Sequence, residues 1–161
     1  MRHLVCGVLI FILWLILTWS VSVPELWVGA FLAVLISIPL SELYPPQIIQ
    51  MLNPRRWLWL VLYIPYFFYY CAKANFDVAY RVLHPDVPIR PGIVKVRTEL
   101  NTDMGKTFLA NSITLTPGTL SVDIHGQELF VHWINVSTDK SEEQTRIIVK
   151  RFERMLKGIF E

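Results

Sequence analysis

Two long stretches without charged side chains constrain the fold of this chain more than any other feature. No charged residue occurs from Leu4 to Pro24, and after Glu25 none occurs from Leu26 to Ser41. A helix needs about 20 apolar residues to cross about 30 Å of hydrocarbon. The first stretch reaches that length, and the second does so if it tilts or includes its neighbours. The sequence therefore predicts two transmembrane helices, over about residues 4–23 and 26–41.

Composition separates an apolar N-terminal part of the chain from a polar C-terminal part. Mean hydropathy is +0.43, and charged residues make up 17% of the chain, below the roughly 25% of ordinary soluble proteins. Residues up to Gly92 include six basic and four acidic side chains, whereas the rest hold nine of each. We expect a membrane domain over residues 1–83, a proline-rich linker over 84–92 and a cytoplasmic α/β domain over 93–161. A net charge of +2 gives no electrostatic case for nucleic-acid binding.

A cleaved signal peptide is an alternative explanation of the first stretch. Met1–His3 is basic, and the small residues Ser20 and Ser22 follow the apolar core, as they do before a cleavage site. The core is longer than that of a usual signal peptide, however, and a second apolar stretch follows at once. The pattern favours a helical hairpin that stays in the membrane.

Small residues mark one face of the second predicted helix. Gly29, Ala33 and Ser37 recur at every fourth position, a spacing that lets another helix backbone approach closely. The packing partner is either the first helix or a separate subunit, and the sequence leaves both open. Basic residues flank the hairpin, at Arg2 and at the pair Arg55-Arg56. The positive-inside rule places them in the cytoplasm, so the hairpin enters from and returns to that side.

A third apolar segment, over about residues 57–83, has two possible placements. Trp57–Ala72 is uncharged, rich in aromatic residues and interrupted by a proline. A spanning helix would carry the following domain outside, whereas an interfacial helix would leave it in the cytoplasm. The short apolar length favours the interfacial helix. Lys73, Asp77 and Arg81 follow at i, i+4 and i+8, and mutual pairing at the membrane boundary explains them more simply than an ion path.

The remainder is predicted to be a small α/β module of order β-α-β-β-α. The predicted elements are strand 93–99, a helix capped by Asn101 or Thr102 that runs to about Leu115, strand 119–124, a turn at 125–128, strand 129–136, and a final helix to about Ile159. We expect Leu120, Val122 and Ile124 to share one face of their strand, and the next strand to be central because it is apolar on both faces. Ser141–Gln144 is typical of a capping box for the final helix.

No constellation of catalytic or metal-ligating residues is apparent in the sequence. The four histidines, His3, His84, His125 and His132, lack the spacing of a metal site, and we expect His132 to be a packing residue. Cys6 and Cys71 are isolated and expected to be buried thiols.

Hydroxyl side chains surround Pro117-Gly118, at Thr114, Thr116, Thr119 and Ser121. They either form an anion nest, with Lys106 as the nearest basic residue in sequence, or cap backbone groups at a tight turn. We favour the capping role, because the chain has no glycine-rich phosphate loop there.

Several short motifs resemble those of one known family. They are Asn111-Ser112-Ile113-Thr114-Leu115-Thr116-Pro117-Gly118-Thr119, with Arg90-Pro91-Gly92-Ile93 before it and Ser121-Val122-Asp123-Ile124 and Leu129-Phe130-Val131-His132 after it. The sequence is similar over its whole length to the E subunit of the Mrp (also Mnh or Pha) multisubunit cation/proton antiporters. The same subunit type recurs in Mrp-like membrane arms of archaeal respiratory complexes such as membrane-bound hydrogenase.

The resemblance implies a non-catalytic accessory or assembly subunit of a complex that exchanges Na⁺ for H⁺. Its partners would be the other subunits and the lipid bilayer, it would use no cofactor, and it would lie in the cell membrane as a multi-pass protein with a cytoplasmic C-terminal domain. The motif residues, including Asp123 and His132, would be structural. Relatives often have an acidic residue at the position of Asn135, so no charge-dependent role is implied there. A membrane-tethered anion-binding sensor or enzyme remains an alternative.

Overall fold

The computed structural model describes residues 2–43 and 53–161, which fall into two compact units, Met1–Leu52 and Asn53–Glu161. The sequence placed the domain boundary at the proline-rich segment 84–92. By its contacts, however, the third helix belongs with the C-terminal module and not with the hairpin. The two units are therefore described separately.

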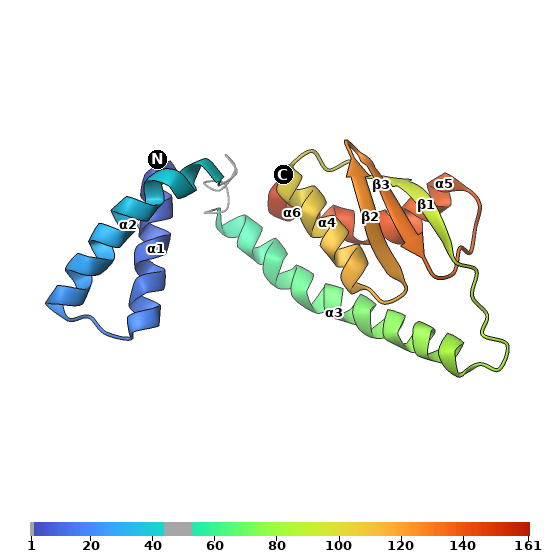
Figure 1. The fold of residues 1–161 in the computed structure, drawn as a ribbon. Coiled ribbons are helices and arrows are strands. Elements are labelled where there is room, and N and C mark those ends of the chain that lie inside the picture. Colours follow the sequence, from blue (N-terminus) through green and yellow to red (C-terminus); the bar gives the residue numbers. More distant parts are fainter. Residues whose placement is uncertain (1, 44–52) are drawn as a thin grey trace. The chain divides into compact units, whose positions relative to one another are not determined.

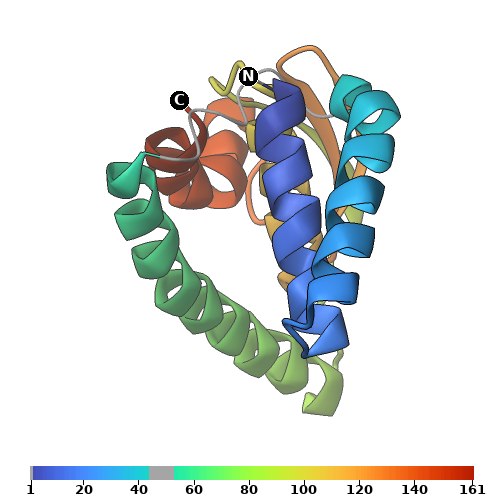
Figure 2. The same cartoon turned by 90° about the vertical axis from the view of Figure 1, so that its left-hand side faces the viewer.

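The first unit is an antiparallel pair of helices, α1 (Arg2–Thr18) and α2 (Val23–Leu43), seen in both Figure 1 and Figure 2. Within the described residues, one helix segment, Val23–Leu40, is both long and apolar enough to cross a bilayer, and α1 is apolar but shorter. The predicted relative lengths of the two helices were therefore wrong. The first ends at Thr18 because Trp19 adopts a left-handed backbone, with φ of 50°, which begins the connection to α2.

The third helix, α3 (Pro54–Leu83), opens the second unit. Its 30 residues extend for about 45 Å at the usual rise of an α-helix. Asn53 caps its first turn, where Oδ1 accepts a hydrogen bond from Arg55 N at 3.0 Å, and Pro54 suits the first helical position. Figure 1 shows α3 running along the helices of the C-terminal module.

The module confirms the order that the sequence predicted. Its elements are β1 (Gly92–Arg97), α4 (Asp103–Leu115), β2 (Thr119–His125), β3 (Glu128–Trp133), and a continuous helical run of α5 (Ser141–Thr145), the π-helical turn η2 (Arg146–Lys150) and α6 (Arg151–Phe160). The antiparallel sheet has the order β1-β3-β2, so β3 is central as expected. The helices cover one face of this sheet, and Val96, Leu129, Val131 and Phe152 are fully buried between the two layers.

Some predicted details of the module were wrong. A register shift between Ser121 and Asp123 puts Ile124 opposite the buried Leu129, whereas Leu120 and Val122 lie exposed. The predicted alternation of side chains along β2 fails because a β-bulge adds one residue, so the residues after the bulge point to the other face of the sheet. His132 is exposed and not packed in the core.

The predicted capping box is also absent. Ser141 Oγ donates to Lys95 O at 3.1 Å, and Lys140 holds the N-cap position without a side-chain hydrogen bond. By contrast, Thr102 caps α4 as predicted, since its Oγ1 accepts a hydrogen bond from Gly105 N at 3.2 Å.

Candidate functional site

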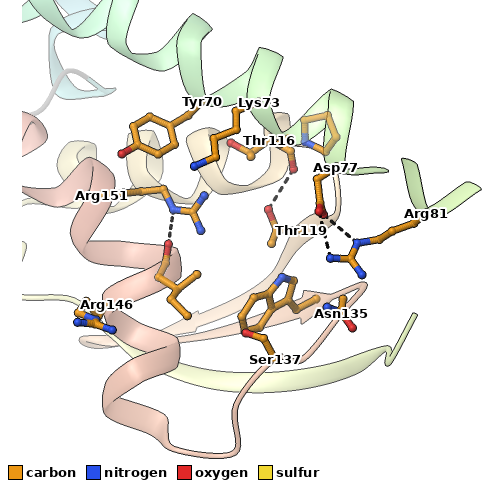
Figure 3. A pocket seen from close by; sticks show the side chains of 14 residues that line it. Tyr70, Lys73, Asp77, Arg81, Thr116, Thr119, Asn135, Ser137, Arg146 and Arg151 are labelled. Atoms are coloured by element: carbon orange, nitrogen blue, oxygen red, sulfur yellow. Dashed lines mark hydrogen bonds and ion pairs between the residues drawn. The ribbon is translucent and has the colours of Figure 1, made fainter. Parts of the chain in front are cut away.

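The candidate site is a cavity of about 490 Å³ beside the C-terminal half of α3. It lies between this helix, the 116–119 turn, the end of β3 with the loop that follows, and η2 with the start of α6. Figure 3 shows the charged side chains that line it, which are Lys73, Asp77 and Arg81 from α3 and Arg146 and Arg151 from the opposite wall. The cavity therefore presents four cationic groups and one carboxylate.

Asp77 and Arg81 neutralise each other at one end of the cavity. Arg81 donates from Nε to Asp77 Oδ2 at 2.8 Å and from Nη2 to Oδ1 at 3.1 Å, a bidentate pair one helical turn apart. Its Nη1 also donates to Pro88 O at 2.7 Å. The Asn135 amide, oriented with its oxygen toward the guanidinium, accepts from Arg81 at 3.2 Å. The pair thus fixes the end of α3 to the segment before β1 and the segment after β3.

Arg151 has a different environment on the opposite wall. Its guanidinium stacks at 5.7 Å from the ring centroid of Tyr70 and 5.8 Å from that of Phe152, and Nε donates to Ile147 O. No carboxylate of the described residues forms an ion pair with it. Burial lowers the pKa of Arg151, because a charged group loses solvation inside a protein.

Lys73 is the second cationic side chain in the cavity that does not pair with a carboxylate. Its ammonium makes no hydrogen bond or ion pair with any residue that the structure describes, and it points into the cavity in Figure 3. The expected pairing among the three α3 charges therefore holds for Asp77 and Arg81 but does not include Lys73.

The hydroxyls of the 111–119 motif bond to the backbone. Thr116 Oγ1 donates to Ser112 O at 2.7 Å, and Thr119 Oγ1 donates to Ile113 O at 2.7 Å and Thr116 O at 3.0 Å. Thr114 Oγ1 accepts from the amide of residue 121 at 3.1 Å. These contacts agree with the capping role that the sequence favoured over an anion nest.

The rest of the motif shapes the chain between α4 and β2. Gly118 has φ of +88°, and a Cβ there would lie 3.0 Å from a side-chain carbon of Ile134, so this position needs glycine. Asn111 is exposed, and Pro117 lines the cavity with Thr116 and Thr119. Lys106, the basic residue nearest in sequence, is not among the lining residues.

The small-residue face of α2 packs against α1, which answers the question that the sequence left open. A Cβ built on Gly29 would lie 2.4 Å from Cδ1 of Trp14, whose Nε1 donates to Glu25 O at 3.1 Å. Ala33 and Ser37 are buried in the same interface. This face therefore holds the two helices of the chain together, and the opposite faces remain exposed.

Contacts of α3 with the module extend over most of its length. Near its start, Arg56 donates to Ile159 O at 3.1 Å and to Glu161 O at 3.0 Å, and Tyr63 is buried with its hydroxyl on Ser112 Oγ. Farther along, Tyr66 Oη donates to Arg151 O at 2.8 Å.

The opposite face of α3 is apolar and exposed. It presents Trp57, Leu58, Val61, Leu62, Phe68, Tyr69, Phe76 and Tyr80. The helix is therefore amphipathic, with one face on protein and the other available to another apolar surface.

A separate charge network ties the segment just after β1 to η2 and α6. Glu99 pairs with Lys150 and, at 2.6 Å, with Lys157, while Lys150 also contacts the buried carboxylate of Glu153 at 3.0 Å. The hydrogen bond from Lys150 and then that from Lys157 lower the pKa of Glu99 to about 2. Thr98 Oγ1 donates to Glu153 Oε1 at 2.5 Å. This network is satisfied internally, so it stabilises the fold and offers no open site.

The sequence located only part of the cavity. Lys73, Asp77, Arg81, Thr116 and Thr119 were singled out separately, and the fold brings them together. Arg146 and Arg151 were missed, because they lie on a helix whose sequence shows only amphipathic spacing. Within the described residues, no group of three His, Cys, Asp or Glu side chains is placed to hold a metal ion.

Comparisons with known proteins give one consistent result. A family model described as "Na+/H+ ion antiporter subunit" matches residues 7–159. The E subunit of the Na(+)/H(+) antiporter of Alkalihalophilus pseudofirmus is 38% identical over 63% of this chain and 65% of its own length. The E1 subunit of the Na(+)/H(+) antiporter of Staphylococcus epidermidis is 29% identical over 98% of this chain and 96% of its own.

A solved structure is similar over nearly the whole chain. It is a chain of the membrane-bound sulfane sulfur reductase, described as an archaeal respiratory membrane complex. That chain is 44% identical, the match covers 99% of each chain, and the TM-score is 0.83.

Proposed function

The chain belongs to the family of Na⁺/H⁺ antiporter E subunits, and from that premise we propose that it is a non-catalytic assembly subunit of an ion-translocating membrane complex. In this role the α1–α2 hairpin anchors the chain in the bilayer. The second unit docks at the cytoplasmic surface of the complex. The ion path then runs through other subunits.

The composition of the hairpin is the first support for this role. Between Leu4 and Ser41 the only charged side chain is Glu25, in the first turn of α2, where the helix dipole favours a carboxylate. An ion path through hydrocarbon needs a series of ionisable groups or ordered water. A hairpin of this composition holds a position in the membrane but offers no relay across it.

The packing of α3 is the observation that carries the proposal. Its contacts with the module extend from Arg56 to Arg81, which supports a helix that stays with the module at the membrane surface over one that crosses the bilayer. With the hairpin alone in the membrane, the module lies on the same side as the N-terminus. The positive-inside rule makes that side cytoplasmic, and the apolar outer face of α3 then rests on the membrane or on a neighbouring subunit.

A pair of alanine substitutions in α2 tests the anchoring role. Ala33 is buried against α1, whereas Ala30 is exposed on the other side of the helix. We expect Ala33→Leu to separate the helices and lower the yield of purified complex, and Ala30→Leu to have a smaller effect. A full yield of complex with Ala33→Leu would contradict the anchoring role.

The proposed role also makes the α3 charges dispensable for transport. In a complex purified at normal yield, the double variant Lys73→Ala with Asp77→Ala should keep measurable ion exchange. Loss of exchange from a fully assembled complex would show that α3 takes part in the ion path.

Two parent complexes fit the family, a stand-alone antiporter and an Mrp-bearing respiratory complex. The 44% identity to a chain of an archaeal respiratory complex supports the Mrp-bearing respiratory complex as the alternative to a stand-alone antiporter. Copurification from native membranes distinguishes the two settings. A redox enzyme in the same particle identifies a respiratory complex, and its absence from an intact, active antiporter identifies the stand-alone form.

A further inference from the structure

The cavity beside α3 contains two cations that no carboxylate of the described residues neutralises. Lys73 lacks a partner within the described chain, and Arg151 bonds a backbone carbonyl and two aromatic faces. Carbonyls and rings orient a guanidinium but do not cancel its charge. Lys73 is exposed, whereas Arg151 is half-buried. Taking an unpaired charge out of water is costly, so a bound anion would stabilise the Arg151 guanidinium, and Lys73 is free to contact the same anion.

The other lining groups also suit an anion. Asp77 is neutralised by Arg81 through two hydrogen bonds, so it adds little repulsion. Arg146 lines the same cavity, and its ion pair with Glu143 is a long contact of 3.5 Å. The Ser137 side chain also lines the cavity and offers a hydroxyl donor. Arginine and lysine together form the usual donor set for phosphate oxygens.

The size of the cavity leaves room for an anion as small as phosphate or for a larger group that carries one. Its volume of about 490 Å³ lies within the range of about 300–1,000 Å³ for small-molecule sites. Tyr69 and Phe76 lie four residues before and three residues after Lys73 on α3, and are 62% and 78% exposed. The apolar outer face of the helix therefore borders Lys73. Cationic groups beside exposed aromatic residues match the boundary between phospholipid head groups and acyl chains.

We propose that this cavity binds a phosphate group, free or as the head group of an anionic phospholipid, through Lys73 and Arg151. The aromatic stack on Tyr70 and Phe152 holds the guanidinium in place, and Lys73 supplies a flexible second donor. The site is separate from the anchoring role of the hairpin, because every residue in it belongs to the second unit.

Calorimetric titration of the full-length chain in a maltoside detergent tests the proposal. The probes are inorganic phosphate, phosphatidylglycerol and phosphatidylcholine, the lipids being added as mixed micelles. We expect saturable binding of phosphate or phosphatidylglycerol. Loss of one charge-assisted contact should weaken binding by about tenfold in Lys73→Gln and in Arg151→Gln.

Two variants separate loss of binding from loss of folding and from a general loss of positive charge. Lys73 is exposed on α3, so Lys73→Gln should leave the thermal unfolding midpoint unchanged even if Arg151→Gln disturbs packing. Lys106→Gln removes a lysine charge from α4, outside the cavity, and should bind as wild type does.

The outcomes separate the two sources of phosphate. Binding of phosphatidylglycerol but not phosphatidylcholine, with competition by inorganic phosphate, identifies a lipid head group. Binding of inorganic phosphate without a preference between the lipids identifies free phosphate. The proposal is overturned if neither probe binds saturably, or if Lys73→Gln binds as tightly as wild type. The anchoring role has its own readout, the yield of the complex.

Discussion

Replacing Tyr63 by alanine should destabilise the C-terminal module, although Tyr63 lies on α3 in a segment with the composition of a membrane helix. Its side chain is only 7% exposed, and its ring lies 6.5 Å from that of Phe152 and 5.9 Å from that of Phe67. Removing a buried aromatic side chain costs about 3–5 kcal/mol. If α3 instead crossed the bilayer away from the module, the substitution would leave the module unaffected.

Two further variants divide this effect into its parts. Tyr63→Phe removes only the hydroxyl that bonds Ser112 Oγ, and Ser112 keeps its hydrogen bond to Phe108 O at 2.5 Å. We therefore expect a cost of about 1 kcal/mol. Phe68, 66% exposed on the same helix, is the matched control, and Phe68→Ala should cost less than about 0.5 kcal/mol.

The measurement is pulse proteolysis of the full-length chain in detergent micelles across a urea series, following cleavage in the module. With a urea dependence of about 2 kcal/mol per molar, Tyr63→Ala should lower the unfolding midpoint by about 1.5–2.5 M. Equal midpoints for Tyr63→Ala and Phe68→Ala would refute the docking of α3 on the module.

Two further substitutions address the hairpin and the charge network. Gly29→Val places a side chain against the Trp14 indole and should destabilise the hairpin by about 1–3 kcal/mol. The measurement is the fraction of the chain that enters the complex. Gly7→Ala is the tolerated control, because a Cβ at Gly7 meets only ordinary contacts at 3.7 Å or more. Glu99 has a pKa lowered from 4.5 to about 2, so its stabilising effect is complete above pH 4.5 and is lost as the pH falls toward 2. Urea midpoints of Glu99→Gln should therefore lie below those of wild type at neutral pH and converge with them near pH 2, and a constant difference across this range would contradict the pairing with Lys150.

The sequence predicted elements better than it predicted their ends and faces. The length of the two uncharged stretches identified the hairpin, because a helix that crosses the hydrocarbon must be apolar along its whole length. The end of α1 was missed, since it depends on the left-handed backbone of Trp19. The face of β2 was missed for a similar reason, because the bulge after Ser121 inverts an alternation that looks regular in the sequence.

The residues of the cavity could also be predicted only in part from the sequence. Lys73, Asp77 and Arg81 were visible as a helical spacing, and one pair formed as that spacing indicates. Arg146 and Arg151 are more than 60 residues away in sequence and carry no motif. Only the packing of α3 across α6 brings them to the same cavity, and no local pattern encodes that long-range contact.

The single charged residue between Leu4 and Ser41 offers the most direct test of the account. Glu25 has a side-chain oxygen, Oε2, that is buried without a hydrogen-bond partner among the described residues. Between Leu4 and Ser41 it is the only charged side chain, so it is the group of this stretch with the chemistry to take part in ion movement. The measurement is the rate of Na⁺/H⁺ exchange per assembled complex in proteoliposomes carrying Glu25→Gln. We expect the wild-type rate, because the hairpin anchors the complex and does not conduct. Loss of exchange from a complex assembled at full yield would contradict that claim.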